Sequence, residues 1–316
     1  MIHPVTRTTA RALTPDELRR CLQGVIAVPV TPFADSGRRV NAEVTRQLVG
    51  HIDRAGVHAV TALGNTGEIF QLTGDERAAV LESVADGCEQ AARIAGVAGP
   101  LAEALNTVDR VRELGYDAVM LHDPVDTFAA GQGLVDYVTG VAEAAPLPVI
   151  LYVRTPRWGL EQLLRAVEHP NVVAVKYAVT DPASVSSVLS SSDLRRACEW
   201  VCGSAETTVP IFAAFGVSGF TSGIASVRPF LPLSLWRATR EDWAAFRAIY
   251  TRIVPFETLR LAHGGRFNIA AVKAALTEDG FDVGDVRPPC VPLDDAGRDA
   301  VRRILRDWDL AEKGYR

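Results

Sequence analysis

Short apolar runs alternate with amphipathic stretches along most of this chain. The runs are rich in Val, Ile and Ala and are bounded by turn residues, which is typical of strands buried on both faces of a parallel sheet. Between them, apolar residues recur at the spacing of a helix with one buried face. Strands are predicted at residues 25–30, 58–63, 94–98, 118–122, 149–152, 172–176, 199–202 and 219–221. Helices are predicted after them at residues 41–55, 73–92, 101–114, 134–144, 160–167, 182–189, 206–215 and 229–238.

Eight successive strand-then-helix units imply right-handed crossovers and a parallel sheet. That number of units fits a closed (β/α)8 barrel better than an open doubly wound sheet. No glycine-rich dinucleotide fingerprint follows the first strand, which weakens the Rossmann alternative. We therefore expect an α/β protein with a TIM barrel at residues 24–240, preceded by a tail and a short helix at residues 1–23. Further helices predicted at residues 242–255, 267–276 and 294–309 indicate a C-terminal helical extension over residues 241–316.

Composition narrows the classes of partner. The chain has 316 residues, a net charge of -5 and a pI near 5.7, and it shows no basic stripe, so we expect no nucleic-acid partner. No apolar run approaches the roughly 18 residues of a membrane span, and residues 1–11 lack the apolar middle of a signal peptide. Five scattered cysteines predict reduced thiols and a cytoplasmic protein. Cys198 and Cys202 have no paired Cys/His set nearby, so we expect neither a metal site nor a cofactor.

One predicted strand ends in an unusual residue. The run at residues 172–176 closes on Lys176, where another Val or Ile would be expected. An apolar strand end disfavours a charged amine and lowers its pKa. A neutral lysine amine can attack a carbonyl to form a Schiff base. The alternative is a structural lysine whose amine reaches out of the strand end to an ion pair.

In such barrels the active site lies at the carboxyl ends of the strands. Tyr152 ends the neighbouring strand and shares its face with Ile150, so it is predicted to point into the barrel mouth beside Lys176 and to shuttle protons there. Hydroxyl and N–H groups at Thr66-Gly67 could hold a substrate carboxylate. The other polar groups at these strand ends are Thr31, Asn65, Glu68, His122, Asp123, Arg154, Arg157, Gly203, Ser204, Thr221 and Ser222.

Several of these positions form a known pattern. The stretch Gly64-Asn65-Thr66-Gly67-Glu68, together with Val30-Thr31-Pro32-Phe33, Tyr152 and Lys176, resembles the dihydrodipicolinate synthase / N-acetylneuraminate lyase family. The resemblance runs from about residue 24 to the end of the chain. It implies a class I, Schiff-base-forming lyase on a (β/α)8 barrel with a C-terminal helical extension, assembled as a homodimer or homotetramer. It also implies that Lys176 forms the imine and that Tyr152 relays protons. The substrate-binding residues that it implies, with Thr221 added from the eighth strand end, are Thr66, Asn65, Gly67, Arg157, Gly203 and Thr221.

Departures from the family pattern bear on the substrate. Asn65 stands where the synthases have the first threonine of G-T-T-G-E, and residues 123–128 lack the tyrosine of their proton relay. Residues 67–73, 219–223 and 286–289 resemble the dehydratase branch more. We therefore expect an aldolase or dehydratase acting on pyruvate or a 2-keto-3-deoxy sugar acid, similar to 5-dehydro-4-deoxyglucarate dehydratase. The alternatives are a true 4-hydroxy-tetrahydrodipicolinate synthase and a non-catalytic keto-acid-binding barrel.

Other rim residues have both a chemical and a structural interpretation. Glu68 could act in the site or tie down the turn, and His122 could be a base or a loop anchor. Trp158 is expected to be a pocket wall or a loop anchor. The roles of Asn65, Asp126 and Arg154 stay open, since each can contact substrate or simply fix a turn or an ion pair.

Overall fold

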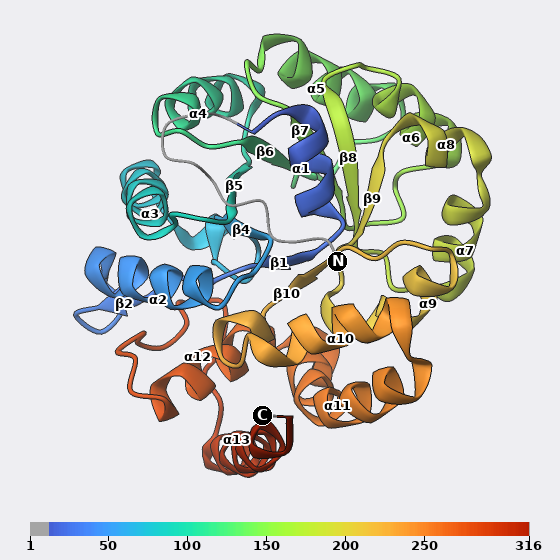
Figure 1. Ribbon diagram of the computed structural model, residues 1–316. Helices are drawn as coiled ribbons and strands as arrows, with labels where there is room; N and C mark the ends of the chain where they lie inside the picture. The colour runs from blue at the N-terminus through green and yellow to red at the C-terminus, as the bar shows by residue number, and fades with distance from the viewer. Residues whose placement is uncertain (1–12, 316) are drawn as a thin grey trace.

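The computed structural model describes residues 13–315, and the tail predicted at residues 1–11 lies outside them. Within this range, parallel strands close into an eight-stranded barrel in the order β1-β10-β9-β8-β7-β6-β5-β4, as Figure 1 shows. The predicted (β/α)8 barrel is therefore confirmed. The barrel strands are β1 (Val25–Ala27), β4 (Ala59–Ala62), β5 (Ala92–Val97), β6 (Ala118–His122), β7 (Val149–Val153), β8 (Val172–Tyr177), β9 (Glu199–Cys202) and β10 (Phe220–Ser222).

Helices surround the strands and connect them. They are α2 (Ala42–Arg54), α3 (Gly74–Gly87), α4 (Leu101–Glu113), α5 (Gln132–Ala144), α6 (Leu160–Val167), α7 (Pro182–Ser190), α8 (Ser192–Ala197), α9 (Val209–Ala214) and α10 (Phe230–Glu241). Short 3-10 turns are η1 (Ile69–Gln71), η2 (Ala205–Thr208) and η3 (Ile224–Ser226), and a small hairpin pairs β2 (Phe33–Ala34) with β3 (Arg39–Val40). The hairpin and α8 were not predicted, because each is too short to show a hydrophobic period.

Alternate strand residues fill the barrel interior. Ile26, Ile94, Met120, Ile150 and Val201 form one buried cluster inside the strands. The intervening residues pack outward against the helices in a second, larger cluster. This two-sided burial is the reason for the continuous apolar runs in the sequence.

One end of the barrel is closed by α1 (Pro15–Leu22). Its N-cap Thr14 accepts a hydrogen bond from the Glu17 backbone N–H, and Glu17 accepts one from the Thr14 N–H at 2.7 Å, as expected for a Thr-Pro-Asp-Glu helix start. Leu18 and Leu22 join the cluster inside the barrel, and Figure 1 shows α1 lying across the barrel opening. This helix therefore fills the amino end of the barrel interior with apolar side chains.

The helix predicted at residues 73–92 is shorter than expected. It ends at Gly87, and β5 begins already at Ala92. The carboxylate of buried Asp53, from α2, accepts hydrogen bonds from the backbone N–H groups of Glu89, Gln90 and Ala91. These bonds hold residues 88–91 as a turn, since they satisfy the backbone without helical pairing.

After the barrel come α11 (Trp243–Gly265), α12 (Asn268–Glu278) and α13 (Asp295–Tyr315), which lie on one side of the barrel in Figure 1. The first of these continues past Pro255, beyond the predicted residues 242–255. It breaks at residues 262–265, where His263, Gly264 and Gly265 have φ values of 53°, 75° and 84°. None of the helices in the described part of the chain combines the length and the apolar character needed to cross a bilayer.

Candidate active site

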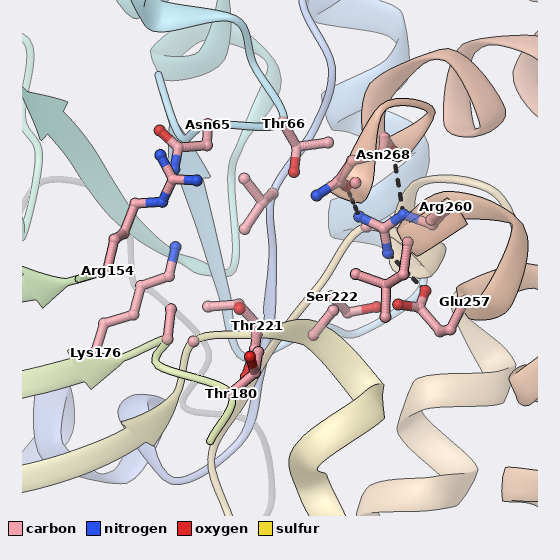
Figure 2. Close-up of a pocket in the computed structure, with 18 of the residues that line it drawn as sticks. Asn65, Thr66, Arg154, Lys176, Thr180, Thr221, Ser222, Glu257, Arg260 and Asn268 are labelled. Carbon is pink, nitrogen blue, oxygen red and sulfur yellow. Dashed lines mark hydrogen bonds and ion pairs between the residues drawn. The ribbon is translucent and has the colours of Figure 1, made fainter. Parts of the chain in front are cut away.

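A cavity of about 490 Å³ opens at the carboxyl ends of the barrel strands. Its position agrees with the rule that active sites of such barrels are built there. Figure 2 shows Lys176 and Arg154 on one side of it and Arg260 and Asn268 on the other. The lining residues are Val28, Asn65, Thr66, Tyr152, Arg154, Lys176, Ala178, Thr180, Gly203, Ser204, Ala205, Thr221, Ser222, Gly223, Glu257, Arg260, Leu261, Gly264, Gly265 and Asn268.

Lys176 and Tyr152 are direct partners across β8 and β7. The Lys176 Nζ lies 3.8 Å from the centroid of the Tyr152 ring and 3.7 Å from the sulfur of Met120. Both side chains are 4% exposed. Burial, and after it the positive charge of Arg154, lowers the pKa of Lys176 to about 7. A large fraction of this amine is therefore neutral and nucleophilic near neutral pH.

Asn65 connects Tyr152 to Arg154. With its amide oriented so that all three groups are satisfied, Asn65 Oδ1 accepts from Arg154 Nε and Nη1 at 2.8 and 2.9 Å, and from the Tyr152 hydroxyl at 3.1 Å. Burial raises the pKa of Tyr152, so its phenol stays protonated and donates to Asn65. Arg154 thus fixes the amide that orients the phenol.

Of the remaining residues of the Gly-Asn-Thr-Gly-Glu turn, one lines the cavity and the others make contacts within the protein. Thr66 lines the cavity, whereas Gly67 does not: its carbonyl accepts a hydrogen bond from the Thr31 hydroxyl at 2.6 Å. Glu68 is buried in a left-handed conformation, with a φ of 58°. Its carboxylate pairs with Lys273 of α12 at 2.9 Å and accepts the Arg287 N–H at 3.0 Å. Glu68 therefore ties the turn to the C-terminal extension.

Arg157 does not line the cavity, contrary to its predicted contact with substrate. Its guanidinium donates to the carbonyls of Pro124, Asp126 and Ala129, which follow β6. The same loop is held by Asp123, which accepts from Trp158 Nε1 at 2.9 Å. The geometry therefore places Arg157 and Trp158 as anchors of the loop over residues 123–129, and Asp126 contributes to the loop by accepting from the Phe128 N–H.

His122 is likewise outside the cavity lining and is almost completely buried. Its Nε2 donates to the Leu63 carbonyl at 2.9 Å. Burial lowers the pKa of His122 to about 3, so the ring is neutral. Its contacts favour the loop-anchoring interpretation over that of a base.

Two further predicted positions lie beside Lys176. Gly203 lines the cavity, and a Cβ there would lie 2.9 Å from Lys176 Cγ and 3.0 Å from the Ala178 methyl. Only glycine leaves the lysine stem in place without a shift. Thr221 also lines the cavity, and its hydroxyl donates to the Cys202 carbonyl at 3.3 Å.

The wall opposite Lys176 comes from the C-terminal extension and was missed from the sequence. Glu257 and Arg260 form a buried ion pair at 2.6 Å, and Arg260 also donates to the side chain and backbone of Asn268. Glu257 and Arg260 lie shortly before the break of α11 at residues 262–265, and Asn268 begins α12 shortly after it. Gly264 and Gly265, at the break, also line the cavity. The Gly264-Gly265 pair was the one local signal of such a break.

Comparison with known proteins gives consistent relatives over nearly the full chain. A model of the dihydrodipicolinate synthetase family matches residues 21–308. A probable 5-dehydro-4-deoxyglucarate dehydratase of Ectopseudomonas mendocina (strain ymp) is 27% identical over 93% of this chain and 98% of its own length. A 4-hydroxy-tetrahydrodipicolinate synthase of Methanopyrus kandleri is 30% identical over 93% of this chain and 98% of its own length. The crystal structure of dihydrodipicolinate synthase from Oceanobacillus iheyensis superposes with a TM-score of 0.87 at 26% identity, covering 94% of this chain and 100% of that one.

Proposed function

Since this chain belongs to the dihydrodipicolinate synthetase family, we propose that it is a lyase that forms an imine between Lys176 and a 2-oxo acid. The observation that carries the proposal is the buried amine of Lys176, 3.8 Å from the centroid of the Tyr152 ring at the mouth of the barrel. The named relatives include a dehydratase and synthases, which supports lyase chemistry without choosing between carbon–carbon and carbon–oxygen cleavage.

The imine step uses the two side chains in complementary ways. The neutral Nζ of Lys176 attacks the C2 carbonyl carbon, and the carbonyl electron pair moves to oxygen. The Tyr152 hydroxyl delivers a proton to that oxygen, and the attached amine returns one proton to the phenolate, which leaves a neutral carbinolamine. Tyr152 then delivers its proton a second time, the carbinolamine hydroxyl leaves as water as the C=N bond forms, and Tyr152 is left as phenolate beside the iminium. The resulting iminium accepts the electrons released at C3, either when a C3 proton is removed before loss of the C4 hydroxyl or when the C3–C4 bond breaks.

The polar character of the cavity favours a substrate longer than pyruvate. Thr66 is available to bind the carboxylate next to the imine carbon, as expected from the sequence. Beyond Lys176 the lining includes the hydroxyl of Thr180, the amide of Asn268 and the guanidinium of Arg260. Asn65 cannot pass a proton onward as a threonine hydroxyl can, which distinguishes this site from the synthase pattern. We infer a 2-keto-3-deoxy sugar acid as the substrate class.

Borohydride reduction in the presence of pyruvate tests the imine. The chain has three lysines, at positions 176, 273 and 313, so peptide mass spectrometry can assign the adduct without ambiguity. We expect the reduced pyruvate adduct on Lys176 alone, its absence in Lys176→Arg, and loss of activity on treatment. An unmodified Lys176 under these conditions would remove the proposal.

Turnover then decides the substrate class. Aldol or dehydration products should form from 2-keto-3-deoxygluconate or 2-keto-3-deoxyglucarate. Faster turnover of pyruvate with aspartate semialdehyde would instead favour the synthase. Binding of sugar acids with neither imine nor product would favour a keto-acid-binding barrel.

A further inference from the structure

Asn268 lies on the wall opposite Lys176, and its amide oxygen already accepts a hydrogen bond from within the protein. Its Oδ1 accepts a hydrogen bond from Arg260 Nη2 at 2.5 Å, and its backbone carbonyl accepts from Arg260 Nε at 3.1 Å. Arg260 is itself fixed by Glu257 at 2.6 Å, and both of these side chains are at most 5% exposed. The guanidinium also lies against Gly223, where a Cβ would be 2.9 Å from Arg260 Nη2. The orientation of the Asn268 amide is therefore set by buried groups.

With Oδ1 held by Arg260, Nδ2 is the hydrogen-bond donor that Asn268 presents to the cavity. Among residues 13–315, Nδ2 donates to no partner within hydrogen-bond distance, and Figure 2 shows it directed across the cavity toward Thr66. An amide NH2 group is a hydrogen-bond donor and cannot accept. A molecule in the cavity can therefore form a hydrogen bond with Nδ2 only through an acceptor atom.

The charge of this wall determines which acceptor fits. The guanidinium of Arg260 has its counterion in Glu257, so the wall has no unbalanced cation to attract a carboxylate. On the Lys176 side, Arg154 has no carboxylate within ion-pair distance among the described residues, and an anionic group is better placed there. A neutral hydroxyl oxygen is therefore the acceptor that suits Asn268. Ser222 and Thr221 also line the cavity, but their hydroxyls donate within the protein, to Glu206 and to the Cys202 carbonyl.

We propose that Asn268 is a specificity-determining residue that donates from Nδ2 to a hydroxyl oxygen on the substrate chain beyond the imine carbon. Arg260 is then a positioning residue that prevents the amide from turning over. The cavity is accordingly selective for polyhydroxylated 2-oxo acids over pyruvate alone. This inference rests on the proposed function, since it takes Lys176 as the point where the substrate is attached.

The test compares two ligands by one measurement, the concentration that gives half-maximal borohydride trapping on Lys176. In Asn268→Leu, we expect this concentration to rise about tenfold for 2-keto-3-deoxygluconate, the effect of losing one good hydrogen bond, and to change less than about twofold for pyruvate. Asn106→Leu, at an exposed position on α4, is the matched control and should leave both values unchanged.

Trapping with pyruvate also reports whether each variant is folded. If Asn268→Leu does not fold, Asn268→Asp replaces it, because the carboxylate keeps the side-chain shape and the bond from Arg260 but cannot donate at neutral pH. An equal rise for both ligands, no rise for the sugar acid, or a wild-type protein that traps pyruvate but not the sugar acid would overturn the inference. Failure of the wild type to trap pyruvate would instead overturn the proposed function.

Discussion

At the scale of single residues, two basic side chains, Lys176 and Arg154, lie on the same side of the cavity. Lys176 is buried between Tyr152 and Met120, and the charge of Arg154 acts on it from the rim. Arg154 also donates twice to Asn65, which accepts the hydroxyl of Tyr152. Arg154 therefore affects both the protonation of the Lys176 amine and the orientation of the Tyr152 hydroxyl.

Removing the Arg154 charge should change the pH dependence of imine formation. In Arg154→Met, the ammonium form of Lys176 loses a repulsive neighbour, so the pKa of Lys176 rises from its present value of about 7. Less neutral amine is then present at a given pH, and the acid limb of the rate of pyruvate imine formation moves to higher pH. A rate profile over about five pH units would show the shift. Arg157→Met, which removes an arginine from the neighbouring loop anchor, should leave the limb in place, and an unmoved or lowered limb in Arg154→Met would contradict this account.

At the scale of elements, a buried ion pair connects the Gly-Asn-Thr-Gly-Glu turn to the C-terminal extension. Glu68 follows Thr66 and Gly67 directly, and it pairs with Lys273 of α12. Lys273 Nζ also donates to the Asp285 carbonyl at 3.0 Å and lies 4.0 Å from the centroid of the Phe33 ring. The turn after β4 is thus positioned by a helix more than two hundred residues away in sequence.

Breaking this ion pair should be costly, because both side chains are at most 2% exposed. Glu68→Gln leaves the Lys273 charge buried without a counterion, and we expect the free energy of unfolding to fall by about 3–5 kcal/mol. The double variant Glu68→Gln/Lys273→Met removes the unpaired charge and should recover a large part of this loss. Denaturant unfolding measures both.

An exposed pair serves as the control. Asp193 and Arg196 lie 2.5 Å apart with side chains 63% and 72% exposed, so Asp193→Asn should cost less than about 1 kcal/mol. Equal losses in the single and double Glu68 variants would show that the buried charge is not the cause.

The sequence predicts those parts of the site that depend on strand alternation and barrel topology, and it does not predict those that depend on contacts between distant segments. The strand ends with Lys176, Tyr152 and Thr66 were predictable because strand alternation and barrel topology bring them to one rim. The loop contacts of Arg157 could not be predicted, since its partners are backbone carbonyls of a loop that has no sequence signature. Glu257, Arg260 and Asn268 could not be assigned because nothing in a helical period indicates which distant surface the helix covers. The expected division into tail, barrel and extension, and the homodimer or homotetramer, stay predictions.

At the scale of the whole molecule, folding keeps two histidines neutral inside the protein. His58 accepts a hydrogen bond from the Val25 N–H at 3.0 Å and packs on Trp236. His122 donates a hydrogen bond to the Leu63 carbonyl. Burial lowers the pKa of His58 to about 4 and that of His122 to about 3, from 6.5. The unfolded chain therefore takes up protons at these residues at a higher pH than the folded protein does.

Mild acid should consequently destabilise the fold. Each of these histidines contributes stability that is complete above about pH 6.5 and is lost as the pH falls toward the folded-state pKa, at about 1.4 kcal/mol per pH unit. Denaturant titrations at several pH values should give a shallower slope for His58→Gln than for the wild type. The same change at exposed His263 should leave the slope as it is, and an identical slope in all three proteins would count against the interpretation.

The break in α11 also has a consequence for how such proteins diversify. Because one wall of the cavity is encoded after residue 240, recombination that exchanges only the C-terminal quarter of the gene would alter that wall while Lys176 and Tyr152 keep their own coding sequence. The strand ends that carry Lys176 and Tyr152 and the helices that carry Arg260 and Asn268 are in this way encoded by different stretches of the chain.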